Sequence, residues 1–234
     1  MLCLCGAIGV AGFSALGIWQ LERRVWKLDL IDRVEHRLQA APVAAPGPDA
    51  WATVSAADDE YRRLAVPGRF VDDRETLVQA VTDLGGGFWV MAPFRTDAGF
   101  IVLVNRGFVP ADKRDPTARP MARVSSDLTV LHGLLRMTEP KGGFLRANDA
   151  AANRWYSRDI QAIAAAQGIA QVAPYFIDAD ATPNPGGWPV GGLTVVSFHN
   201  SHLVYAVTWF GLALMMLGAV AYLLRQATRS SGRD

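Results

Sequence analysis

The chain has 234 residues, and its charged residues amount to 19%, below the share of about a quarter that is usual in soluble chains. The deficit lies at the two ends, because residues 1–21 and 181–224 contain no Asp, Glu, Lys or Arg. The net charge of +1 excludes both a basic surface for nucleic acid and an acidic disordered chain. The composition therefore favours one folded domain with apolar anchors at its ends.

The first apolar segment predicts a transmembrane helix in residues 1–21. About 20 helical residues cross the hydrocarbon core of a bilayer, which is about 30 Å thick. No basic residue precedes the segment and Trp19 stands at its end as an interfacial anchor, which favours a retained helix over a cleaved signal peptide. An amphipathic helical extension is predicted over 22–40, where apolar residues recur at spacings of three and four: Leu21, Val25, Leu28, Ile31, Val34 and Leu38.

A second transmembrane helix is predicted in residues 200–224, followed by a tail, 225–234, with three arginines. Positive residues at a membrane end favour the cytoplasmic side, so we expect both termini in the cytoplasm. Since no Arg- and Ser-rich transit sequence precedes the first helix, the expected location is the bacterial inner membrane, with the central domain in the periplasm. Small residues at helical spacing predict that the two helices pack together: Ala7, Ala11, Ala15, Gly211 and Gly218.

The central domain, 41–199, is predicted to be mostly strand. Runs rich in Val, Leu, Phe and Thr predict strands at 61–71, 75–81, 88–95, 100–109, 128–137, 174–179 and 193–198. One helix is predicted with Ser157 or Asp159 as its N-cap and Gly168 as its C-terminal stop. The expected fold is an α+β membrane protein, in which two transmembrane helices flank a mostly antiparallel β domain, with a partly closed barrel as one form of it.

One arginine falls inside an otherwise apolar strand. Arg106 lies between Val104 and Phe108, so we expect its guanidinium to be paired or hydrogen-bonded. Gly107 beside it indicates a bulge or the close approach of another backbone segment.

Motifs of soluble enzymes do not occur in the sequence. It has no Gly-x-Ser-x-Gly elbow, no His-Glu-x-x-His and no phosphate-binding loop. Both cysteines lie in the first apolar segment, so the central domain has no thiolate metal cluster. We therefore expect a protein that is not an enzyme.

The histidines give the candidate site. His36 is predicted to be solvated and His132 to be structural, whereas His199 and His202 lie at the mouth of the second membrane helix, where ionisable residues are costly unless they serve a ligand or partner. On a helix, His202, Tyr205 and Trp209 would share one face. An imidazole over an aromatic wall suits an axial ligand of haem iron, but the same stripe suits a helix-packing face, and the sequence leaves both open.

Six separated strings occur in order along the chain: GIWQLERRVWK at 17–27, EYR at 60–62 with GRF at 68–70, VNRGFVP at 104–110, NRWYSRD at 153–159, PYFID at 174–178 and NSHLVYAVTWFGL at 200–212. In these strings the chain resembles the surfeit locus protein one family, which are assembly factors for cytochrome c oxidase. The resemblance extends over nearly the whole chain.

The resemblance implies a role in delivering haem a to oxidase subunit I, or in retaining it there, during maturation. His202 matches the candidate haem ligand of that family, whereas His199 has no clear counterpart. The implied partners are subunit I, haem a synthase and copper chaperones, besides the lipid bilayer. The alternative is a cofactor-free membrane scaffold that holds nascent subunit I near other assembly factors.

Overall fold

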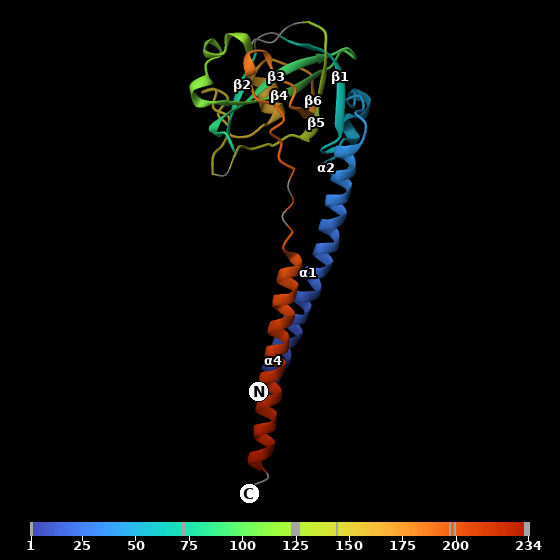
Figure 1. The fold of residues 1–234 in the computed structure, drawn as a ribbon, viewed down its shortest axis with the longest axis vertical. Coiled ribbons are helices and arrows are strands. Elements are labelled where there is room, and N and C mark those ends of the chain that lie inside the picture. Colours follow the sequence, from blue (N-terminus) through green and yellow to red (C-terminus); the bar gives the residue numbers. More distant parts are fainter. Residues whose placement is uncertain are drawn as a thin grey trace. The chain divides into compact units, whose positions relative to one another are not determined.

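The computed structural model describes residues 2–71, 74–122, 127–143, 145–196, 198 and 200–231 (Figure 1). The chain divides into two compact units, Met1–Arg33 with Val196–Asp234, and Val34–Val195. The first unit contains the apolar ends of the chain, and the second contains all of the described strands.

Two long helices make up most of the first unit, α1 (Leu2–Gln39) and α4 (His202–Ser231). Both are long and apolar enough to cross a membrane, with mean hydropathies of 1.6 and 2.0 in their most apolar windows. α1 is continuous through the predicted amphipathic extension, but Leu21, Val25 and Leu28 on its apolar stripe are exposed. Only farther along the stripe does a side chain, Val34, become fully buried.

The second unit contains six described strands: β1 (Arg63–Phe70), β2 (Thr76–Thr82), β3 (Gly85–Thr96), β4 (Ile101–Pro110), β5 (Thr129–Met137) and β6 (Val172–Ala179). They follow the order β1-β5-β6-β4-β3-β2, and an additional pairing of β1 with β3 closes five of them into a barrel. β2 extends the sheet outside this closure. Only β4 and β6 run parallel, so the prediction of a mostly antiparallel β domain is confirmed.

The closure of the barrel depends on Gly68. Three residue pairs join β1 to β3, of which the first is Gly68 with Thr96. A Cβ atom at Gly68 would lie 2.3 Å from the carbonyl oxygen of Arg95, so any larger residue would push the two strands apart. This contact joins segments 27 residues apart in sequence, and the strand patterns could not predict it.

Apolar side chains fill the barrel and also cover part of its outer face. Alternate residues of the five strands form the interior, with Phe94, Val104 and Tyr175 among them. A second cluster lies on the other face of the sheet, where α3 (Ile160–Ala166) packs with Trp155. Asp159 is the N-cap of α3, as one of the two predicted alternatives had it, and Gly168 follows the helix with a φ of 69°.

The remaining described elements are short. α2 (Ala56–Asp59) is a single helical turn, and 3₁₀ turns occupy Pro48–Thr53, Ala111–Lys113, Pro116–Ala118, Pro120–Ala122 and Pro185–Gly187. The predicted strand at 193–198 is wrong over its described residues, 193–196 and 198, which are irregular. Val190 instead makes an isolated two-bond bridge to Phe108, so the chain reaches the barrel just before the predicted strand.

Candidate functional site

The predicted ligand His202 is the first residue of α4, and it contacts α1. Its Nδ1 lies 2.8 Å from Oε1 of Gln20, whose side chain is buried between the helices. Gln20 lies in the first of the six strings, whereas sequence reasoning had singled out only His202. The pairing required knowing that α1 and α4 are antiparallel neighbours.

Small residues of α1 bring the two helices close together. A Cβ atom would lie 2.7 Å from the Phe210 ring at Gly17 and 2.2 Å from Val220 at Gly6. Between these two contacts Phe13 stacks on Trp209, with ring centroids 5.8 Å apart. The predicted helix packing is therefore confirmed.

The packing uses a different set of small residues from the one predicted. Ala7, Ala11 and Ala15 are exposed, and a Cβ at Gly211 or Gly218 would meet no described atom within 4 Å. The predicted stripe was one of two small-residue rows on α1. Composition alone could not tell which row faces the partner helix.

Of the three predicted site residues on α4, two face α1. His202 contacts Gln20 and Trp209 contacts Phe13, but Tyr205 is 53% exposed and does not join them. Ala206, 1% exposed, takes the place on the packed face that the spacing had given to Tyr205. At about 100° per residue, positions 205 and 206 lie about equally far, on opposite sides, from the line through 202 and 209, so the spacing alone does not decide between them. His199 lies outside the described residues.

The hydrogen bond of His202 determines which ring nitrogen is available to a ligand. An amide oxygen can only accept, so in the neutral form of the ring this contact assigns the proton to Nδ1 and the lone pair to Nε2. Within the described chain no residue bonds Nε2. Metal-bound histidines in proteins are held in this way, with the other ring N–H donated to an oxygen. The described residues contain no group of three or more His, Cys, Asp or Glu that could bind a metal ion.

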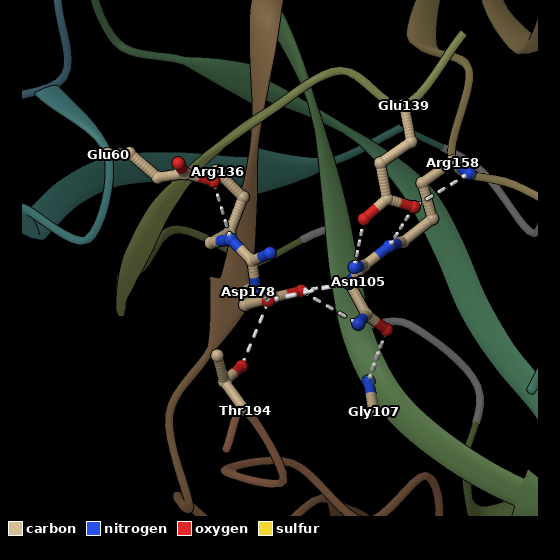
Figure 2. Close-up of polar contacts among 8 residues, drawn as sticks. All are labelled: Glu60, Asn105, Gly107, Arg136, Glu139, Arg158, Asp178 and Thr194. Atoms are coloured by element: carbon tan, nitrogen blue, oxygen red, sulfur yellow. Dashed lines mark hydrogen bonds and ion pairs between the residues drawn. The ribbon is translucent and has the colours of Figure 1, made fainter. Parts of the chain in front are cut away.

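A second polar cluster lies in the β domain, around the buried carboxylate of Asp178 on β6 (Figure 2). Four side chains donate to it: Asn105 at 2.8 Å, Thr194 at 2.9 Å, and Arg136 and Arg158 at 3.1 Å each. Asn105 is oriented by the backbone N–H of Gly107, which donates to its Oδ1. Most of these residues fall in the strings that carry the family resemblance.

The two arginines of this cluster also bind outer carboxylates. Arg136 pairs with Glu60 and Arg158 with Glu139, so five charged groups form a continuous row through Asp178. Burial raises the pKa of the Glu139 carboxyl, but the hydrogen bonds and charge of Arg158 outweigh it and hold that pKa below its usual value. Through Asn105 and Arg136, the Asp178 carboxylate joins β4 and β5 to β6.

A third cluster confirms the prediction for Arg106. Its side chain is 3% exposed, donates to Glu75 at 2.9 Å and to Asn184 at 3.2 Å, and lies over the Phe70 ring. Arg119 pairs with the same Glu75 carboxylate. Gly107 is the predicted point of close approach, since a Cβ there would lie 2.2 Å from the Val190 carbonyl oxygen.

The histidines of the β domain and of the α1 C-terminus are exposed. His36 lies on the solvent side of α1, as predicted. His132, which was predicted to be structural, is instead exposed on β5 and lines a hollow of about 250 Å³ together with Asp178 and Asp180. Neither histidine lies in the described apolar core.

Comparison with known proteins gives one consistent result. The SURF1 family model matches residues 7–214. Surfeit locus protein 1 of Homo sapiens is 37% identical over 223 residues, which cover 88% of this chain and 71% of the relative, and that of Xenopus tropicalis is 37% identical over 222 residues, 88% and 69%. A SURF1-like protein of Monosiga brevicollis is 36% identical over 231 residues, 93% of this chain and 85% of the relative.

Proposed function

The chain belongs to the SURF1 family, and from that premise we propose that it is an assembly factor for haem-copper (cytochrome c) oxidase that holds haem a during the maturation of subunit I. The role is one of binding and transfer, without catalysis. The observation that carries the proposal is the His202–Gln20 pair, which presents one imidazole nitrogen at the end of an apolar helix pair.

The residues present fit a haem that takes one protein ligand. When bound, haem a would supply an iron that accepts a nitrogen ligand from the protein. His202 would provide Nε2, and Gln20 would fix the ring orientation and tautomer through Nδ1. Tyr205, exposed next to His202, remains available as a wall for the macrocycle, whereas Trp209 is already stacked on Phe13.

A second candidate function is the cofactor-free scaffold that holds nascent subunit I. It is favoured by the contacts of Phe13 with Trp209 and of Gly17 with Phe210. These contacts fill the space between α1 and α4 along the part of α4 that follows His202. Under this alternative the His202–Gln20 bond only holds the two helices together. The two candidates differ in whether the purified protein carries haem.

The membrane location is part of the proposal. The two apolar helices are compatible with a bilayer, and Arg225 and Arg229 near the end of α4 favour a cytoplasmic location for both termini. We place the protein in the bacterial inner membrane with its β domain in the periplasm. Subunit I, haem a synthase and copper chaperones are the partners expected there.

The test is the absorption spectrum of the full chain purified in detergent from cells that make haem a. We expect the wild type to carry haem and His202→Ala to lose most of it while keeping its helical circular dichroism. His132→Ala, which removes an exposed histidine of β5, serves as the matched control and should keep the wild-type haem content. If the wild type and every variant lack haem, the scaffold function is the better account; if His202→Ala keeps the wild-type spectrum, the assigned ligand is wrong.

A further inference from the structure

Two arginines face each other where the barrel closes. Arg69 on β1 pairs directly with Arg95 on β3, and both side chains are exposed on the outer face. Directly opposite residues of an antiparallel pair have Cβ atoms about 5 Å apart, and like charges at such positions destabilise the sheet. The position is also rigid, because Gly68 and the edge-to-face contact of Phe70 with Phe94 fix the two strands.

Neither guanidinium bonds to any part of the described chain. No hydrogen bond or ion pair of the Arg69 or Arg95 side chain occurs there, although many other arginines of the β domain bind a carboxylate: Arg62, Arg106, Arg119, Arg136, Arg154 and Arg158. Two like charges that face each other without a partner among the described residues are the arrangement that a bound anion would stabilise, since a carboxylate between them accepts hydrogen bonds from both.

A hollow with both polar and apolar lining adjoins this pair. Arg95 lines a cavity of about 360 Å³ whose walls include Pro93, Phe100, Ile101 and Ile169. Arg74 borders the same hollow, where its guanidinium donates to the carbonyl oxygen of Gln167. The surface thus offers cationic groups beside apolar side chains.

We propose that Arg69, Arg95 and this hollow form a docking surface for an acidic segment of a partner protein. A carboxylate side chain of the partner binds between Arg69 and Arg95, and a neighbouring apolar side chain enters the hollow. A free phosphate or sulfate would use the arginines and leave the apolar walls uncovered, whereas a peptide carrying both kinds of side chain covers both, and arginine is enriched in protein interfaces for this reason. The surface lies within the β domain, so the proposal does not depend on haem binding.

The probe is a fluorescein-labelled decapeptide that alternates glutamate with leucine, measured by anisotropy against the full chain in nanodiscs of neutral phosphatidylcholine. A second peptide has glutamine in place of each glutamate. We expect the glutamate peptide to bind about tenfold more tightly than the glutamine peptide, the size of one charge-assisted contact. The doubly substituted variant Arg69→Gln, Arg95→Gln should lose this preference.

Arg63→Gln is the matched control, because Arg63 is exposed on the same face of β1, six residues from Arg69. It should bind the glutamate peptide as the wild type does, and equal loss in the control would show unspecific attraction and overturn the proposal. Inorganic pyrophosphate that displaces the labelled peptide at the same concentration as unlabelled peptide does would also overturn the proposal, because it would indicate a site for small anions. Competition by anionic phosphatidylglycerol placed in the nanodiscs would assign the surface to the bilayer instead.

Thermal unfolding without peptide separates a docking role from a structural one. Since the Arg69–Arg95 repulsion is uncompensated, Arg95→Gln should unfold at the same temperature as the wild type or at a higher one. A clear drop in its unfolding temperature would mean that Arg95 supports the fold, which contradicts the proposal.

Discussion

Gln20 is the residue that gives His202 a defined orientation, and its effect on the ligand is open to test. Gln20→Leu keeps the size of the side chain but removes the oxygen that accepts from Nδ1. We expect it to lower haem affinity by about 10- to 100-fold, as the loss of such supporting bonds does at other metal-bound histidines. Gln20→Glu should keep the haem and shift its reduction potential downward, because a carboxylate makes the imidazole a stronger donor.

Gln39→Leu, a change of an exposed glutamine on the same helix, is the control for these variants and should leave affinity and potential unchanged. Unaltered haem affinity in Gln20→Leu would show that the His202–Gln20 bond has no part in binding. A reduction potential that does not move in Gln20→Glu would argue against Nε2 as the ligand atom.

For single residues, the sequence predicted a specific role where the residue type conflicts with its surroundings. Arg106 in an apolar strand and His202 at a membrane mouth both violate the local pattern, and both have specific partners. The partners themselves, Glu75 and Gln20, lie in segments that look ordinary. Their roles depend on contacts over 31 and 182 residues of sequence, which no local pattern encodes.

Among the elements, β4 depends on the cluster around Glu75. The largely buried Glu75 carboxylate pairs with two guanidiniums, and Arg106→Ala removes one of them. We expect a loss of about 3 kcal/mol in the free energy of unfolding. Glu75→Ala should cost at least as much, because both Arg106 and Arg119 lose their shared carboxylate. Arg63→Ala, on the exposed face of β1, should change the stability little.

Chemical denaturation of the full chain in detergent, followed by far-ultraviolet circular dichroism, measures these differences. Equal stabilities of Arg106→Ala and Arg63→Ala would show that the Glu75 cluster adds nothing to the fold. If oxidase assembly were nevertheless lost in Arg106→Ala, the residue would belong to a partner-binding surface.

The elements themselves were largely predictable because each has a local cause. Runs rich in Val, Leu, Phe and Thr predicted β1, β4 and β5 close to their observed bounds, and Asp159 with Gly168 predicted α3. Where the cause is not local, prediction failed. Residues 193–196 have the composition of a strand, but the barrel is already closed by β1 and β3 and offers them no edge.

For the whole molecule, composition separated an apolar helical unit from a β domain, since charge-poor segments of membrane-spanning length stand at both ends of the chain. Composition could not predict the closure of the barrel or the register of α1 against α4. Both are set by glycines at particular contacts, Gly68 between strands and Gly6 and Gly17 between helices, and small residues of the same kind also occur at exposed positions such as Gly218.

The central claim, that the imidazole of residue 202 binds haem a, is tested most directly by restoring that imidazole from solution. His202→Gly removes the side chain and leaves room for free imidazole beside Gln20. We predict that this variant, purified from cells that make haem a, lacks the wild-type haem spectrum and regains it when imidazole and haem a are added together. Retention of the wild-type spectrum by His202→Gly without imidazole would contradict the claim.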